Sequence, residues 1–249
     1  MYPELLHIGP VTIYSWGAML ALALLVIAFL LNRRFREEGI NPDYALDLIL
    51  LCVVAGIVGA RLFYVVFYDW SYFVAHPREI FSFGSGAIAG LMWYGGFFGG
   101  AAAFYAYVRW RHLSFWAMAD IFAPYLALGY ALVRIGCFLN GCCYGVATNL
   151  PWGVVFPGVG DLHRHPTQLY STMLNLLIFW GLLKLYPRRS YKGEVFLAYL
   201  GLYSLYRFII EFFRENLVIG GVLTISQWIA MVMVLVTGGL YILLKKRSN

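Results

Sequence analysis

Apolar residues run in seven long segments along this chain. The segments lie near residues 12–31, 44–68, 87–108, 115–137, 167–186, 194–213 and 222–243. A helix that crosses the hydrocarbon core of a bilayer needs about 20 mostly apolar residues, and each segment approaches or exceeds that length. The pattern predicts an all-α fold, a polytopic membrane helix bundle of about seven transmembrane helices. We expect a single integral membrane domain over residues 1–249.

The composition agrees with a lipid environment. Hydrophobic residues make up 62% of the chain and charged residues only 12%, whereas a soluble domain carries about a quarter charged residues. The net charge of +6 would suit nucleic acid, but a membrane protein needs basic loops to set its orientation. We therefore expect the lipid bilayer as a partner, and no nucleic acid.

The basic residues predict the orientation. Twelve of the 18 lysines and arginines follow the first, third, fifth and seventh segments. These are Arg33, Arg34, Arg36, Arg109, Arg111, Lys184, Arg188, Arg189, Lys192, Lys245, Lys246 and Arg247. Loops rich in lysine and arginine stay in the cytoplasm. The N-terminus is thus expected outside and the C-terminus inside.

Three arginines lie in or at the edge of apolar segments, namely Arg61, Arg134 and Arg207. A charged arginine at mid-membrane costs at least about 2.5 kcal/mol. An ion pair with Asp47 or Asp120 would account for Arg61. Arg134 and Arg207 lie toward the outer ends of their segments, where a guanidinium can hold a lipid phosphate by bidentate hydrogen bonds. We expect an outward-facing lipid site there.

A run of glycines marks the third segment. Gly95 with Gly99, and Gly96 with Gly100, form small-xxx-small pairs that let two helices approach closely. This spacing favours helix packing over a chemical role.

Polar residues also recur at helical spacing in the sixth segment. Tyr203, Arg207, Glu211 and Arg214 share one face, and Arg207 and Glu211, four residues apart, can form an ion pair. A purely structural pair is the simpler interpretation of these two residues alone. The continuation of the polar face to Arg214 favours a functional one.

Three cysteines follow Arg134 in the turn after the fourth segment. Cys137, Cys142 and Cys143 lack a paired C-x₂-C spacing, and the nearest histidines, His163 and His165, lie some twenty residues away. Zinc sites usually show clearer spacing, so we expect no metal and small packing residues instead. His165 and Gln168 are predicted one turn apart at the start of the fifth segment, where a helix cap would also explain them.

Taken in order, these stretches resemble the bacterial prolipoprotein diacylglyceryl transferase family over nearly the whole chain. The stretches are Ile13-Tyr14-Ser15-Trp16-Gly17, Gly59-Ala60-Arg61, Gly95-Gly96, Arg134-Ile135-Gly136, His165-Pro166-Thr167-Gln168-Leu169-Tyr170, the Arg207, Glu211 and Arg214 helix, and Leu223-Thr224-Ile225-Ser226-Gln227. The resemblance implies a multi-pass enzyme of the bacterial inner cell membrane. Such an enzyme moves the diacylglyceryl group of phosphatidylglycerol to the lipobox cysteine thiol in the signal peptide of a prolipoprotein. Glycerol-1-phosphate is released in this first step of lipoprotein maturation, and no cofactor or metal is needed.

The resemblance also implies roles for individual residues. Arg134 would bind the phosphate, Arg207 would assist it, and Glu211 would orient Arg207. Tyr94 completes the expected catalytic set as a candidate base. The expected substrate-binding residues are Arg134, Asn140, Gly145, His165, Gln168, Tyr203 and Arg214.

The chain departs from the family pattern where the thiol must lose its proton. Family members commonly carry histidine before the Gly-Gly pair, where this chain has Tyr94. A tyrosine ordinarily ionises near pH 10, so it is a poor base at neutral pH unless nearby arginines help. Either Tyr94 or His165 would then be the base. Two alternatives stay open, a catalytically altered relative that binds anionic lipid or lipoprotein without transfer, and a transporter for an anionic substrate.

Overall fold

The computed structural model is mostly helical. It describes residues 1–249 except 10, 69, 82–89, 215–217, 220–222 and 249. The chain forms two compact units, the first from Met1–Leu31 and Trp116–Asn249 and the second from Asn32–Phe115.

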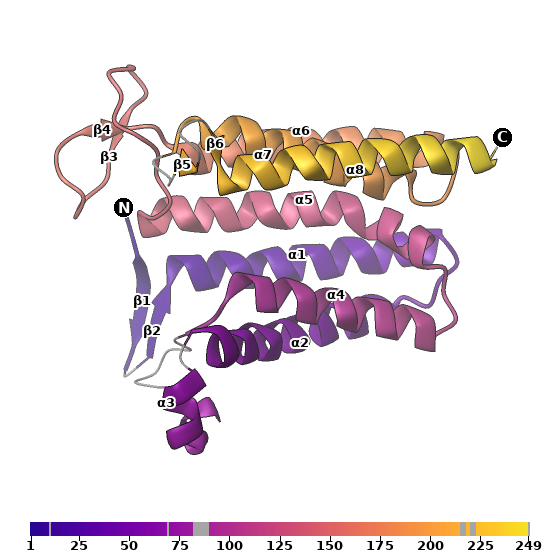
Figure 1. The fold of residues 1–249 in the computed structure, drawn as a ribbon, viewed down its shortest axis with the longest axis horizontal. Coiled ribbons are helices and arrows are strands. Elements are labelled where there is room, and N and C mark those ends of the chain that lie inside the picture. Colours follow the sequence, from indigo (N-terminus) through magenta and orange to yellow (C-terminus); the bar gives the residue numbers. More distant parts are fainter. Residues whose placement is uncertain (10, 69, 82–89, 215–217, 220–222, 249) are drawn as a thin grey trace. The chain divides into compact units, whose positions relative to one another are not determined.

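The first unit is built on long helices that lie side by side (Figure 1). They are α1 (Ser15–Glu37, in this unit to Leu31), α5 (Phe115–Asn140), α6 (Thr167–Leu185), α7 (Glu194–Glu211) and α8 (Ile225–Ser248). A short 3-10 helix, η3 (Tyr186–Arg188), follows α6. Helix α7 packs against both α6 and α8, and α1 packs against α5, where a Cβ at Gly136 would lie 2.9 Å from Met19 Cβ.

Three antiparallel hairpins lie at one end of these helices (Figure 1). They pair β1 (Glu4–Ile8) with β2 (Val11–Tyr14), β3 (Val154–Val155) with β4 (His163–Arg164), and β5 (Val218–Ile219) with β6 (Leu223–Thr224). The end of α5, the start of α6 and the end of α7 meet there, which gathers several predicted site residues.

The second unit contains two long helices and a short helical segment. These are α2 (Asp43–Phe67), α3 (Trp70–Ala75), η1 (Pro77–Phe81) and α4 (Trp93–Trp110). Helix α4, in the third predicted span, begins at Trp93, because Met92 has an extended backbone (ψ 126°) and Gly90 a left-handed one (φ 72°). Residues 87–89 of that span lie outside the described part of the chain.

Glycines let α2 and α4 touch backbone to backbone. A Cβ at Gly95 would lie 2.2 Å from the Gly59 carbonyl oxygen, and one at Gly99 would lie 2.3 Å from the Ala55 carbonyl oxygen. Neither position has room for a side chain. The prediction that this run serves helix packing is confirmed, because Gly95 and Gly99 lie one turn apart against the same face of α2.

The protein is a multi-pass membrane protein. Each predicted apolar segment overlaps a helix of at least 18 residues. Five of them, α1, α2, α5, α6 (with η3) and α8, are long and apolar enough to cross a membrane. Their outward faces carry large apolar side chains such as Leu25, 69% exposed, and Leu235, 74% exposed. Such surfaces need lipid rather than water around them.

The predicted ion pair of Arg61 with Asp47 or Asp120 is wrong. Asp120 is fully buried and accepts hydrogen bonds from the Gly193 and Phe196 amides, so it caps the start of α7. Asp47 accepts from the Tyr107 hydroxyl at 2.7 Å. Arg61 instead donates to main-chain carbonyls, those of Glu79 at 2.9 Å and Ile80 at 3.0 Å among them. Its guanidinium therefore holds η1 beside α2.

The close glycine contact gives a first prediction. Gly95→Ala should lower the free energy of unfolding by about 1–3 kcal/mol, because its Cβ would overlap the α2 backbone. Gly96→Ala is the matched control, since its Cβ would lie 3.5 Å from the Gly56 carbonyl oxygen, an ordinary contact. Thermal unfolding of the two variants in one detergent measures the difference. Equal stability would contradict this account of the helix contact.

Candidate active site

Arg134 lies two turns before the end of α5, in an environment without an acidic partner. Its side chain is half-buried. It donates to the Tyr130 hydroxyl and its guanidinium lies 4.7 Å from the centre of the Tyr130 ring. Among the described residues, no carboxylate lies within ion-pair distance of it. Arg134 thus keeps a net positive charge that no described side chain neutralises.

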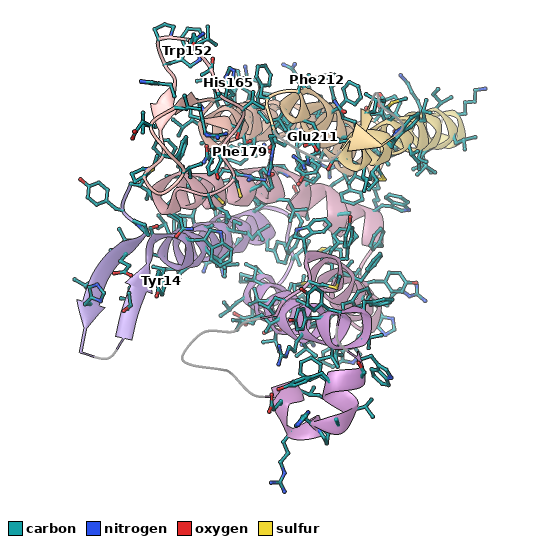
Figure 2. All side chains as sticks on the ribbon, turned by 60° about the vertical axis from the view of Figure 1, so that its left-hand side comes forward. Tyr14, Trp152, His165, Phe179, Glu211 and Phe212 are labelled. Atoms are coloured by element: carbon teal, nitrogen blue, oxygen red, sulfur yellow. The ribbon has the colours of Figure 1, made fainter. Side chains whose placement is uncertain are left out.

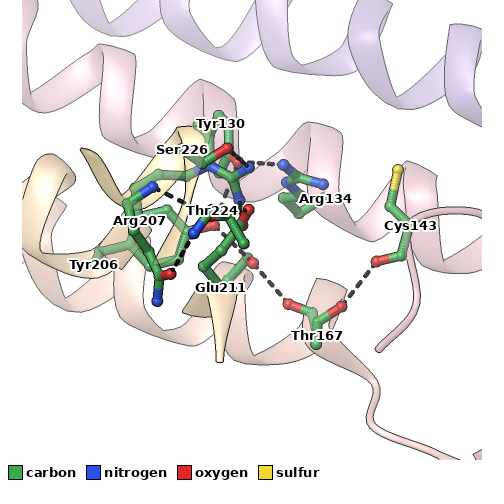
Figure 3. Close-up of polar contacts among 11 residues, drawn as sticks. Tyr130, Arg134, Cys143, Thr167, Tyr206, Arg207, Glu211, Thr224 and Ser226 are labelled. Atoms are coloured by element: carbon green, nitrogen blue, oxygen red, sulfur yellow. Dashed lines mark hydrogen bonds and ion pairs between the residues drawn. The ribbon is translucent and has the colours of Figure 1, made fainter. Parts of the chain in front are cut away.

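A chain of hydroxyl groups links Arg134 to two further helices (Figure 3). The Tyr130 hydroxyl lies 3.3 Å from that of Tyr206 on α7, which donates to Ser171 Oγ on α6 at 2.7 Å. Ser171 then donates to the Thr167 carbonyl oxygen at 2.6 Å. Because each hydroxyl is held by the next, the acceptor for Arg134 is fixed by three helices at once.

Arg207 has a different electrostatic environment. Its Nη1 lies 3.1 Å from Glu211 Oε2, and the Glu211 side chain is only 1% exposed. Thr224 at the end of β6 donates to the other carboxylate oxygen of Glu211 at 3.0 Å, and Arg207 donates to Ser226 at 3.2 Å. The predicted pairing of Arg207 with Glu211 is therefore confirmed. The carboxylate orients this arginine and neutralises most of its charge.

The turn after α5 brings three cysteines back toward the helix. Asn140 is the last residue of α5, and Gly141 (φ 74°) and Cys143 (φ 66°) have left-handed backbones that reverse the chain. Two side chains at the start of α6 hold this turn: Gln168 donates to the Cys142 carbonyl oxygen at 2.6 Å, and Thr167 donates to that of Cys143 at 2.8 Å. The fully buried Gln168 thus acts on the turn that follows Arg134.

Gly145 is required by close packing. Its amide donates to the His165 carbonyl oxygen at 2.9 Å, and the His165 amide donates to that of Val146 at 3.0 Å. A Cβ at Gly145 would lie 2.2 Å from the Phe213 carbonyl oxygen and 2.8 Å from His165 Cβ. The glycine therefore lets the ends of α6 and α7 meet the turn, and the expected contribution to the headgroup pocket stays a prediction.

The His165 ring contacts a tyrosine hydroxyl that a tryptophan also binds. Trp152 Nε1 donates to the Tyr170 hydroxyl at 2.7 Å, and that hydroxyl lies 3.1 Å from His165 Nδ1. The tautomer of the ring sets which atom of the second contact is the donor. Figure 2 shows Trp152 on the projecting segment that leads into β3 and His165 nearer the helices. The contact with Tyr170 fixes the orientation of the imidazole.

Arg214 supplies a second positive charge near the turn. It follows α7, its side chain is half-buried, and it makes no ion pair with a described residue. The pKa of the Cys143 thiol is lowered, first by its contacts with the thiols of Cys137 and Cys142 and then by the charges of Arg134 and Arg214. Both guanidinium groups therefore act on the Cys143 thiol.

The remaining predicted residues lie in different places. Tyr203 belongs to an aromatic cluster on α7, with its ring centre 5.4 Å from that of Tyr130 and 5.6 Å from that of Tyr206. Tyr94 lies in the first turn of α4 in the second unit and is 52% exposed. The hydroxyl groups of Tyr130, Tyr206 and Ser171 were not predicted from the sequence as part of the site. Only the spacing of Tyr130 four residues before Arg134 could have indicated one of them.

Comparison with known proteins identifies the family. The family model for prolipoprotein diacylglyceryl transferase matches residues 3–243. The chain belongs to the prolipoprotein diacylglyceryl transferase family. The family's motifs quoted from the sequence fall in both units, and those around Arg134, His165 and Arg207 meet at one end of the first unit.

Individual relatives support the same assignment. The chain is 35% identical over 221 residues to the phosphatidylglycerol–prolipoprotein diacylglyceryl transferase of Clostridium tetani, which covers 87% of this chain and 86% of the relative. It is 36% identical over 253 residues to the transferase of the same name from Bordetella parapertussis, with 96% and 94% covered. The enzyme from Geobacter sulfurreducens is 35% identical over 216 residues, with 86% and 82% covered. The likeness to these diacylglyceryl transferases thus extends over nearly the full length.

The hydroxyl chain of this diacylglyceryl transferase family member gives a second prediction. Tyr130→Phe removes the acceptor of a charged donor and should destabilise the protein by about 1.5–3 kcal/mol. Tyr199→Phe is the control, because Tyr199 is buried and its hydroxyl makes no hydrogen bond within the described residues. Thermal unfolding in detergent distinguishes the two, and a loss as large for Tyr199→Phe would count against a specific role for Tyr130.

Proposed function

We propose that this protein transfers the diacylglyceryl group of phosphatidylglycerol to the lipobox cysteine of a prolipoprotein, releasing glycerol-1-phosphate. Membership of the family supports the reaction. The observation that carries the proposal is the unneutralised charge of Arg134, held by hydroxyl groups at one end of the first unit. An arginine kept without a carboxylate at a membrane surface suits an anionic ligand that supplies the missing negative charge.

We further propose that the chain is one integral domain of the bacterial inner membrane, with seven spans and the N-terminus outside. Helices α4 and α7 have 18 residues each, within the range of about 17–25 that spans a bilayer. In the first unit the hairpins lie at one end and the basic C-terminal end of α8 at the other (Figure 1). The positive-inside rule then puts the hairpins, and Arg134 with them, on the outer side.

The proposed reaction exchanges one bond at the lipid. The lipobox thiolate attacks the glycerol carbon of the diacylglyceryl group, a carbon–sulfur bond forms, and the carbon–oxygen bond to the phosphate breaks. The electron pair leaves with glycerol-1-phosphate, so negative charge grows on the departing phosphate. Arg134 and Arg214 would hold that charge, which is the kind of preorganised electrostatic stabilisation that enzymes use most.

Other residues would shape the headgroup pocket around these charges. Glu211 orients Arg207, whose residual donors would assist Arg134 in binding phosphate. His165, whose ring is oriented by Tyr170, would contact the headgroup. Asn140, Gly145, Gln168 and Tyr203 would shape the pocket, Gln168 by fixing the turn after α5.

The phosphate role of Arg134 gives a third prediction. Arg134→Ala should lower the rate of transfer from labelled phosphatidylglycerol to a lipobox peptide by about 10²–10³-fold, the usual cost of losing one preorganised donor at a developing anion. Arg134→Lys should recover part of the rate, since it restores charge but not the bidentate geometry. Arg33→Ala is the control, because Arg33 forms only an exposed pair with Glu37.

The wild-type protein also tests the competing interpretations. Binding of phosphatidylglycerol without transfer at any pH would make the chain a catalytically altered relative. Flux of an anionic substrate into vesicles, with no transfer, would favour a transporter. Either result would overturn the proposed reaction.

The thiol must lose its proton, and we propose that Tyr94 accepts it. The Tyr94 side chain is 52% exposed, and it stands directly before Gly95-Gly96, where members of the family commonly carry histidine. The proton leaves the thiol for the phenolate, and the thiolate then attacks.

The role of Tyr94 is the fourth prediction. Tyr94→Phe should lower the rate by about 10²-fold, within the range for removal of a general base. Tyr94→His should restore the rate at neutral pH, because a free imidazole ionises near pH 6.5 and is a good base there. Tyr105→Phe is the control, since Tyr105 is equally exposed on the same helix. If Tyr94→Phe keeps the wild-type rate, Tyr94 is not the base.

A further inference from the structure

The three cysteines of the turn after α5 form a compact sulfur cluster. Cys137 lies in the last turn of α5, and Cys142 and Cys143 follow that helix. Their sulfur atoms all lie within 4.8 Å of one another, and those of Cys142 and Cys143 are 3.6 Å apart. All three are free thiols. The spacing of these cysteines along the chain did not predict a metal site. The left-handed turn at Gly141 and Cys143, which brings the sulfurs together, cannot be recognised from that spacing.

Hydrogen bonds from the end of α5 and from the start of α6 hold the turn that carries these cysteines. The Cys142 amide donates to the Cys137 carbonyl oxygen at 3.1 Å, which closes the turn on the helix end. From α6, Gln168 and Thr167 donate to the carbonyl oxygens of Cys142 and Cys143. Gln168 and Thr167 are 0% and 2% exposed. The thiols are therefore positioned by buried hydrogen bonds before any ligand binds, and less conformational freedom is lost when one does.

The sulfur spacing suits a single metal ion. Zinc–sulfur bonds are about 2.3 Å long, so three sulfurs around one ion lie roughly 4 Å apart. The observed spacing of 4.8 Å or less reaches this arrangement with small side-chain rotations.

The local charge favours the same ligand. Three thiolates and one divalent cation carry a net charge of about −1. The charge of Arg134 acts on both Cys137 and Cys143, and that of Arg214 acts on Cys143. Such a complex would be electrostatically matched by the neighbouring guanidinium groups.

We propose that Cys137, Cys142 and Cys143 bind one thiophilic metal ion, such as Zn²⁺, through three thiolates at the C-terminal end of α5. Soft thiolate ligands select this class of ion over Mg²⁺ or Ca²⁺. This proposal does not rest on the proposed transfer reaction, because the ligands are the sulfurs and not the arginines, although the same two arginines lie near both.

Cobalt titration of the full-length protein in detergent tests the site. The protein is first reduced and freed of metal, and Co²⁺ is then added as a spectroscopic substitute for Zn²⁺. We expect one Co²⁺ per chain with sulfur-to-cobalt charge-transfer absorption, and displacement of the cobalt by Zn²⁺. Cys137→Ser, Cys142→Ser and Cys143→Ser should each weaken binding by at least about tenfold. Cys52→Ser, a change on α2 in the second unit, should leave it unchanged.

A measurement on the unmodified protein covers the case in which a variant fails to fold. Zn²⁺ should slow alkylation of Cys137, Cys142 and Cys143 relative to metal-free protein, as followed by mass spectrometry of the peptides. The proposal is overturned if reduced wild type shows no charge-transfer absorption, or if the absorption survives in the three serine variants. It is equally overturned if the purified protein holds two of these cysteines in a disulfide that forms in preference to metal binding.

Discussion

A guanidinium group that is partly removed from water needs either a counter-charge or a set of fixed dipoles, and Arg134 has the dipoles. The Tyr130 hydroxyl accepts its hydrogen bond, and Tyr206 and Ser171 hold that hydroxyl in turn. Hydroxyl groups stabilise the cation without neutralising it, so its charge remains available to a ligand. The contacts among α5, α6 and α7 at this end of the first unit depend on that arrangement, because each helix contributes one member of the chain.

Arg207, the residue after Tyr206, is stabilised by a counter-charge instead of by hydroxyl dipoles. Its charge is matched by the buried Glu211, which is also fixed by Thr224. An unmatched charge there would be costly in lipid, whereas a fixed pair lowers the cost of both groups. The site therefore combines one neutralised arginine that organises the end of α7 with two arginines, Arg134 and Arg214, whose charge no described carboxylate matches. The two unmatched charges would suit the departing phosphate of the proposed reaction.

The membrane setting explains the packing as much as the chemistry. Apolar burial gives little drive for helix association in lipid, so close backbone contact has to supply it. Gly59, Gly95 and Gly99 allow that contact between α2 and α4. The buried Asp120 is bonded to main-chain amides and caps the start of α7. Such capping replaces the water that a soluble protein would use.

The sequence by itself determined the features that depend on local spacing and composition. Apolar length predicted where the long helices lie, the Arg207–Glu211 pair followed from a separation of four residues, and the motif order indicated the family. Only the tertiary structure decided which hydroxyl groups surround Arg134. It also decided that position 145 has no room for a side chain and that the three cysteine sulfurs lie close together. These contacts join helices or turns far apart in the chain. Which residues meet in such contacts depends on three-dimensional packing, and helical periodicity does not predict it.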